Sequence, residues 1–342
     1  MSETVTTTIP ETPKTVRLMN GDTFTFKSNT STTLEKIPVI DAARIWSEKV
    51  DDRKAVAEEV RAASREIGFF YLVNHGIDAS YSERTFEKAK RFFQLPEEKK
   101  MGVFTGLVPN EYVGFHPMEC YNRNGWKYQD LSEAFNWSYD PAYDPNAPAD
   151  APESVSIWPS ESDAPGFKDT LYAYHAQLLT LSRRLTRIFA LALHLEEDAF
   201  DEYVRRPEAG MRILHYPEQQ HSVDDQNGIG AHTDVECFTI VTQDDCGGLE
   251  VLSKTGNWIK AEPILTNDFF VSTVHRVINK SGKERYSAPF FFGFDRRKLL
   301  EPVDTCVSDE NPMKYPVMTG GEYYAWRSNR QKSTSTVNNA EY

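Results

Sequence analysis

The chain has 342 residues, long enough for one large domain or for a domain with an extension. Hydrophobic residues make up 39% and charged residues 26%, which indicates a folded globular protein rather than a disordered one. The formal net charge is -13, and no long run of Lys or Arg offsets it. Because such a surface repels phosphates, we expect no nucleic-acid partner.

The cysteine content and the N-terminal residues are evidence on the compartment in which the protein acts. The four cysteines form no Cys-x-x-Cys pair and are too sparse for a disulfide framework, so we expect a reducing compartment. Residues 1–16 contain no apolar signal region, and no stretch approaches the roughly 20 apolar residues of a membrane-spanning helix. We therefore expect a cytoplasmic protein with no membrane partner, and we take it to be a monomer.

The N-terminal half is predicted to be a leader followed by helices and short strands. Within a flexible leader of residues 1–35, an Asn-Gly pair between two β-prone runs predicts a hairpin over 16–26. The next predicted elements are a strand at 37–40, a helix at 51–67, a buried strand at 69–73 and a helix at 79–94.

The C-terminal half changes from helix to strand. After a loop-rich stretch, apolar residues that step alternately by four and three predict a long core-packing helix over 167–195. Short β-prone runs, typical of a sandwich or barrel, then follow at 212–216, 230–243, 249–253, 258–261, 270–277 and 286–294. The order predicts a mainly β protein with a helical N-terminal part, divided into residues 1–35, 36–165 and 166–342.

One segment of the β-rich half suggests a metal site. In Gly230-Ala-His232-Thr-Asp234, residues two apart on a strand would face the same side, so His232 and Asp234 would both point inward. A second imidazole, such as His275, would complete two-His-one-carboxylate ligation, which suits non-haem Fe(II). Taken alone, such a triplet is more often a solvated strand face, and His275 alone is more often a core histidine.

Ten residues after His275, Arg285 and Ser287 share a strand face. A guanidinium fork beside a hydroxyl suits a carboxylate at the bottom of a pocket. A buried Arg without an acidic partner would be costly, so a carboxylate ligand gives this residue a role.

Motifs in both halves support this interpretation. In chain order they are Ile37-Pro-Val-Ile-Asp41, Arg65-Glu-Ile-Gly-Phe-Phe-Tyr71, Val73-Asn-His-Gly76, Arg91-Phe-Phe-Gln-Leu-Pro96, Arg212-Ile-Leu-His-Tyr-Pro217, His232-Thr-Asp234, Gly247-Gly-Leu-Glu-Val251, His275-Arg-Val277 and Arg285-Tyr-Ser287-Ala-Pro-Phe-Phe-Phe292. With these motifs, roughly residues 36 to 296 resemble the Fe(II)/2-oxoglutarate-dependent dioxygenases of the isopenicillin-N-synthase-like group, especially the fungal secondary-metabolism members. The resemblance implies a double-stranded β-helix (jelly roll) core flanked by helices.

The resemblance also implies roles for particular residues. His232, Asp234 and His275 would bind iron, and Arg285 and Ser287 would bind the distal carboxylate of 2-oxoglutarate with help from the Tyr216 hydroxyl. The implied cofactors are Fe(II), 2-oxoglutarate and O₂, with ascorbate as a possible reductant. The implied reaction oxidises 2-oxoglutarate to succinate and CO₂ and hydroxylates, desaturates or cyclises a small organic molecule. The other histidines match no ligand position.

Two departures from the family pattern leave alternatives open. Asp234 and His275 are only 41 positions apart, about one strand of ~5–6 residues plus a turn short of the family pattern. Either residues 262–270 rebuild the crossing, or His275 misses the iron and the chain is a catalytically impaired relative. A third alternative is an iron oxidase that does not use 2-oxoglutarate. Leu214 also replaces a polar residue of many relatives.

The substrate is not evident from the sequence. Phe290, Phe292 and the loop from Tyr112 to Tyr121 are candidates for lining its pocket. Ordinary core and lid packing explains these aromatic residues at least as well.

Overall fold

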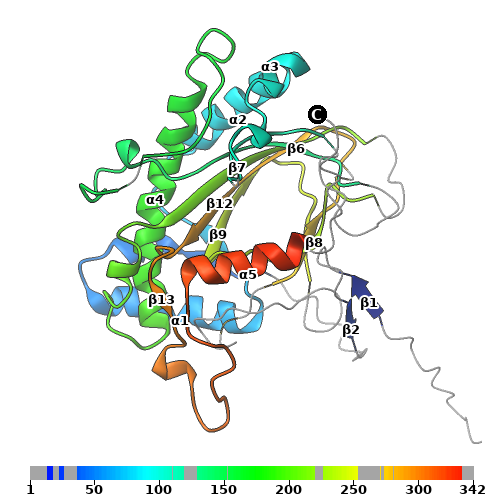
Figure 1. The fold of residues 1–342 in the computed structure, drawn as a ribbon. Coiled ribbons are helices and arrows are strands. Elements are labelled where there is room, and N and C mark those ends of the chain that lie inside the picture. The colour runs from blue at the N-terminus through cyan, green and yellow to red at the C-terminus, as the bar shows by residue number, and fades with distance from the viewer. Residues whose placement is uncertain are drawn as a thin grey trace, which may run out of the picture.

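The computed structural model describes residues 14–17, 23–26, 37–109, 111–118, 129–151, 153–219, 226–252, 270, 273–279 and 281–332. Its core consists of two antiparallel sheets with helices around them, the jelly-roll architecture that the sequence predicts (Figure 1). None of the described helices is both long and apolar enough to cross a bilayer.

Most of the α-helices come early in the chain, and they lie beside the sheets (Figure 1). The α-helices are α1 (Val50–Glu66), α2 (Ser80–Phe93), α3 (Glu97–Met101), α4 (Phe167–Ala192) and α5 (Gly320–Lys332). Short 3-10 turns occur at Ala42–Trp46, Thr105–Leu107, Pro141–Tyr143, Asp201–Tyr203 and Asp304–Cys306.

The larger sheet has five strands in the order β5-β6-β7-β12-β9. These strands are β5 (Gly114–His116), β6 (Glu133–Trp137), β7 (Glu208–Tyr216), β9 (Phe238–Gln243) and β12 (Arg285–Gly293). The helix α4 lies along this sheet (Figure 1) and packs against β12. In this contact the ring centroids of His175 and Phe290 are 4.9 Å apart. The apolar stripe of α4, including Leu171, Leu178 and Leu185, is buried, as the periodicity predicts.

The smaller sheet has three short strands in the order β10-β11-β8. They are β8 (Ile229–His232), β10 (Leu249–Val251) and β11 (His275–Val277). The strand β11 runs antiparallel to both neighbours, and His275 lies directly opposite His232 of β8. Register therefore brings two of the predicted iron ligands side by side.

In the described part of the chain, three two-stranded sheets lie outside the core. They are formed by β1 (Lys14–Arg17) with β2 (Thr23–Phe26), β3 (Val39–Asp41) with β4 (Tyr71–Val73), and β13 (Leu299–Leu300) with β14 (Met318–Thr319). The β1–β2 pair is antiparallel, as expected of the hairpin, although residues 18–22 between them lie outside the described residues.

Two strand predictions are wrong in detail. The strand predicted as buried at 69–73 is β4, whose Tyr71 is 57% exposed, because within the described part of the chain β4 pairs with β3 alone and nothing covers one face of that pair. The single run predicted at 230–243 is two strands in different sheets, because the chain bends at 233–237 and crosses from β8 to β9. The strand predicted at 258–261 lies outside the described residues.

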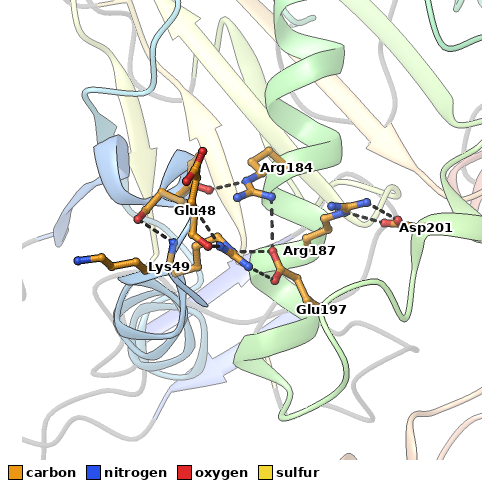
Figure 2. A network of polar contacts seen from close by, with 9 residues as sticks. Glu48, Lys49, Arg184, Arg187, Glu197 and Asp201 are labelled. Atoms are coloured by element: carbon orange, nitrogen blue, oxygen red, sulfur yellow. Dashed lines mark hydrogen bonds and ion pairs between the residues drawn. The ribbon is translucent and has the colours of Figure 1, made fainter. Parts of the chain in front are cut away.

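A network of ion pairs ties the N-terminal helix α1 to the end of α4 (Figure 2). Arg53 of α1 donates to both carboxylate oxygens of Glu197, at 2.8 and 2.6 Å, and Arg184 of α4 lies 3.4 Å from the same carboxylate. Arg187 forms a second two-bond pair with Asp201. Arg53, Arg184 and Arg187 each lie beside a carboxylate, so these ion pairs hold α1 and α4 against the segment that follows α4.

Candidate metal centre

Three side chains meet at one end of the smaller sheet. His232 is the last residue of β8, His275 is the first of β11, and Asp234 follows two residues after β8. The Oδ1 atom of Asp234 lies 3.8 Å from Nε2 of His232 and 3.7 Å from Nε2 of His275. One ligand atom from each residue lies within 4.8 Å of the other two, so one ion can contact all three. Of the described residues, only these three form such a group.

The backbone orients both imidazole rings toward this point. Nδ1 of His232 lies 2.8 Å from the carbonyl oxygen of Gly230, and Nδ1 of His275 lies 3.1 Å from that of Thr273. A carbonyl oxygen only accepts, so Nδ1 is the donor in each contact and Nε2 is the ring nitrogen that faces Asp234. Two imidazoles and one carboxylate, with their ligand atoms converging, fit Fe(II).

The way Asp234 reaches the centre differs from the prediction. Strand alternation would have placed His232 and Asp234 on one face of one strand. Instead β8 ends at His232, and Asp234 lies in the bend that leads to β9. The two side chains converge because this bend turns back toward β11 rather than because of a pleat.

His275 reaches the centre despite the short spacing after Asp234. It is paired with His232 in register, and its ring centroid lies 4.3 Å from that of His232. Residues 253–269, where the family pattern is shortened, lie outside the described residues. The alternative in which His275 misses the iron is therefore not favoured.

Arg285, at the start of β12, is the second conspicuous polar group. Its side chain is only 1% exposed, and its guanidinium lies 4.6 Å from the ring of Tyr216. It donates to the Gly247 carbonyl oxygen, to Oε1 of Gln243 at 2.7 Å and to Oγ of Ser287 at 3.3 Å. All three acceptors are neutral, so this buried cation suits an anionic ligand.

Tyr216 and Ser287 complete this second group. The ring of Tyr216 is 1% exposed, and burial raises the pKa of its hydroxyl against the opposing effect of Arg285. Leu214 pairs with Ser287 across the β7–β12 ladder and is buried among apolar side chains. The non-polar residue at 214 thus adds no hydrogen-bonding group there.

A cavity of about 430 Å³ opens beside the triad. Asp234 and His275 line it, together with apolar residues of α4, of β9 and of the segment before β4, and with two tyrosines of α5. The wall residues from these elements include Leu178, Leu181, Leu185, Phe189, Phe238, Ile240, Phe69, Phe70, Tyr323 and Tyr324. A cavity of this size and character suits a small organic molecule.

The pocket residues suggested by the sequence are largely not those of the cavity. Phe290 and Phe292 are fully buried in the core, where Phe292 packs against Phe238 with ring centroids 5.3 Å apart. Tyr112 lies against His116 and does not line the cavity, and residues 119–121 are outside the described residues. The packing explanation is therefore the right one for both phenylalanines.

Sequence reasoning missed Glu236, a further residue of the cavity. Burial, followed by repulsion from Glu208, raises the pKa of this carboxyl to about 8. The signal was present, because a charged residue interrupts an apolar run two positions after Asp234. It was indistinguishable from an ordinary solvent-facing residue of a strand.

Comparison with known proteins adds independent support. Residues 37–161 match the model of the non-haem dioxygenase N-terminal region (DIOX_N, described as in morphine synthesis), and residues 207–294 match the 2OG-Fe(II) oxygenase superfamily. The 2-oxoglutarate-Fe(II) type oxidoreductase ppzC of Metarhizium majus is 36% identical, covering 92% of this chain and 93% of that relative. The 2-oxoglutarate-Fe(II) type oxidoreductase hxnY of Emericella nidulans is 31% identical, covering 82% and 86%.

Solved structures agree with these relatives. The crystal structure of full-length Neurospora crassa T7H in complex with alpha-KG and thymine superposes with a TM-score of 0.76 at 26% identity, covering 90% of this chain and 100% of that one. The fold, the converging triad and these similarities define a non-haem oxygenase. The chain belongs to the 2-oxoglutarate-Fe(II) oxygenase family and is an Fe(II)/2-oxoglutarate-dependent dioxygenase.

Proposed function

We propose that His232, Asp234 and His275 bind Fe(II), and that Arg285 and Ser287, with Tyr216, bind the distal carboxylate of 2-oxoglutarate. The convergence of two oriented imidazoles and a carboxylate at one point carries this proposal. It is supported by a buried guanidinium whose described hydrogen-bond partners are all neutral.

Bound Fe(II) would offer open coordination positions to 2-oxoglutarate and O₂, whose reaction to succinate and CO₂ supplies the oxidising power. Asp234 would balance part of the ion's charge, while Gly230 and Thr273 hold the two imidazoles in the ligating tautomer. The fork of Arg285 would fix the far carboxylate of the co-substrate and hence its orientation. The apolar cavity walls would exclude water from the oxidised carbon.

We infer that the substrate is a small organic molecule, which the enzyme hydroxylates, desaturates or cyclises at a C–H bond. The cavity of about 430 Å³ and its apolar walls support this size and class. The related structure of Neurospora crassa T7H contains thymine, which is a small organic molecule. From the resemblance to fungal members we infer a role in secondary metabolism, and a cytoplasmic monomer with ascorbate as a possible reductant stays a prediction.

Succinate formation tests the proposal and separates it from an iron oxidase that does not use 2-oxoglutarate. The enzyme is incubated with Fe(II), 2-oxoglutarate, O₂ and a panel of small organic compounds that includes thymine. We expect one succinate for each molecule of oxidised product, and no product when 2-oxoglutarate is omitted. Product formed without 2-oxoglutarate, or without loss in Asp234→Ala, would contradict the proposal.

A further inference from the structure

Glu236 lines the cavity beside the candidate iron site. Glu236 and Asp234 are two residues apart in the bend between β8 and β9, and both line the cavity with His275. Glu236 is partly buried and is one of the residues that line the cavity. Among the described residues, neither a hydrogen bond nor an ion pair satisfies its carboxyl; Glu208, Asp234 and Arg296 act on it only through space.

The neighbouring strand makes room for this carboxyl. At Gly293, the last residue of β12, a Cβ atom would overlap Oε2 of Glu236. A larger residue at 293 would therefore displace the carboxyl from its position. Because Gly293 has no side chain, the carboxyl group of Glu236 has room beside the end of β12. The cavity that Glu236 lines is otherwise largely apolar.

Arg296, the nearby cation, does not pair with Glu236 because its guanidinium already pairs with Glu208. Arg296 is paired with Glu208 through two contacts, Nε to Oε2 at 2.6 Å and Nη2 to Oε1 at 2.8 Å. Its guanidinium also lies over the ring of Tyr324 of α5, 4.3 Å from the centroid. The Arg296–Glu208 pair is neutral as a unit, which leaves Glu236 as the unmatched group.

A carboxyl group without a protein partner in a largely apolar cavity favours a ligand that satisfies it. A carboxyl can accept a hydrogen bond in either protonation state, and as a carboxylate it also attracts a cation. As a carboxylate it disfavours an anionic ligand. A ligand that suits both protonation states therefore has a hydrogen-bond donor, a positive charge, or both, attached to a body that fits apolar walls.

We propose that Glu236 anchors a nitrogen of the substrate, so that this oxygenase acts on small amines or N–H heterocycles. The apolar body of such a substrate would lie against Phe189, Phe238 and the leucines of α4. Its ammonium or N–H group would donate to Glu236. This inference rests on the proposed function because it names the substrate class of the same site.

Four probes of similar size test this preference by isothermal titration of the enzyme loaded anaerobically with Fe(II) and 2-oxoglutarate. Benzylamine is compared with benzoate, and indole with benzofuran. We expect each nitrogen probe to bind about tenfold or more tightly than its counterpart, because a charge-assisted hydrogen bond has a free energy of this order. Glu236→Gln should lower benzylamine affinity about tenfold, whereas Glu202→Gln, an exposed acid outside the cavity, should not.

Gly293→Ala provides a second variant that leaves Glu236 in the sequence but displaces its carboxyl. We expect it to weaken benzylamine binding as Glu236→Gln does. Equal affinities within each probe pair, no nitrogen-probe binding at millimolar concentration, or unchanged benzylamine binding in Glu236→Gln would overturn the inference. The visible band of iron-chelated 2-oxoglutarate is recorded for every variant. A band without nitrogen preference refutes this inference alone, whereas no band in the unsubstituted enzyme refutes the proposed function.

Discussion

The two sheets of the core differ in the length of their strands, in the burial of their side chains and in the functional residues that they carry. In the larger sheet, β7 and β12 each have nine residues, and fully buried side chains such as Phe290 and Trp137 pack beneath α4. In the smaller sheet the strands have only three or four residues, and the candidate iron ligands lie at or just beyond strand ends. We infer that the larger sheet provides most of the stability of the fold. The end of the smaller sheet holds the candidate residues for the chemistry.

This division has a physical basis. Side chains in the middle of a covered strand are enclosed by neighbours on all sides, which stabilises the fold but leaves no room for a ligand. A strand end next to a bend places a side chain at the border of the packed layer. Arg285 is the link between the regions, because it begins β12 of the larger sheet while its Nε donates to Gly247, just before β10 of the smaller one.

Removing a ligand should have the largest effect and should leave the larger sheet intact. We expect His232→Ala, Asp234→Ala or His275→Ala to lower Fe(II) affinity and turnover more than a hundredfold, above the 10–100-fold typical of second-sphere changes. Thermal unfolding should stay within a few degrees of the unsubstituted protein. Iron dialysis and calorimetry check this, and unchanged iron stoichiometry in any of the three would contradict the ligand assignment.

Damage to the larger sheet should have the opposite signature. Phe290 is fully buried between His175 and Phe292, so Phe290→Ala should lower the free energy of unfolding by about 3–5 kcal/mol. The protein that remains folded should still bind one iron. Val241→Ala, at the half-exposed edge strand of the same sheet, is the control and should cost about 1 kcal/mol or less in denaturant unfolding. Equal losses in the two variants would refute the comparison.

Arg285→Lys tests the link between the sheets. Lysine keeps the charge but lacks the planar fork, so we expect the apparent affinity for 2-oxoglutarate to fall about ten- to a hundredfold, with iron affinity largely kept. Arg276→Lys in β11, whose guanidinium pairs with Glu250 away from the triad, is the matched control. An unchanged co-substrate requirement in Arg285→Lys would favour an oxidase that does not use 2-oxoglutarate.

The pH dependence of the free energy of unfolding tests the packing of α4 against the larger sheet. Burial lowers the pKa of His175 to about 4, against the weaker opposing effects of its contact with the Ala209 carbonyl oxygen and of Asp144 and Asp140. Between this value and the usual 6.5 the unfolded state binds the proton and the folded state does not, so stability falls with falling pH. This histidine should contribute a loss on the order of 2 kcal/mol between pH 7 and pH 5.

The measurement is denaturant unfolding at both pH values. His175→Asn should reduce the difference between them by about that amount. His194→Asn, at an exposed position with φ of 59°, a conformation that Asn tolerates, is the matched variant with which His175→Asn is compared. An identical pH dependence in His175→Asn and the unsubstituted protein would refute this role.

Sequence reasoning succeeded where the signal is local. The apolar stripe predicted a helix over 167–195, and α4 spans Phe167–Ala192. The motifs around His232, His275 and Arg285 indicated the family, because each combines a residue type with a spacing that the chemistry requires. Such signals need no knowledge of how distant segments pack.

It failed where tertiary context decides. The β-prone pattern continues through 230–243, so the bend at 233–237 and the change of sheet left no trace in it. Apolar alternation could not reveal that β4 has one exposed face, or that Phe290 lies in the core rather than the cavity. The wall contributed by Tyr323 and Tyr324 depends on how α5 folds back across the sheets (Figure 1), which no local pattern encodes.

We propose that the triad and Arg285 form one site in which 2-oxoglutarate would chelate iron. Anaerobic titration of the purified chain with Fe(II) and then with 2-oxoglutarate tests it most directly. We predict a saturable visible charge-transfer band at one iron per chain that is absent in Asp234→Ala and needs more 2-oxoglutarate in Arg285→Lys. Failure of the unsubstituted chain to bind iron, or iron binding without any band, would contradict the account.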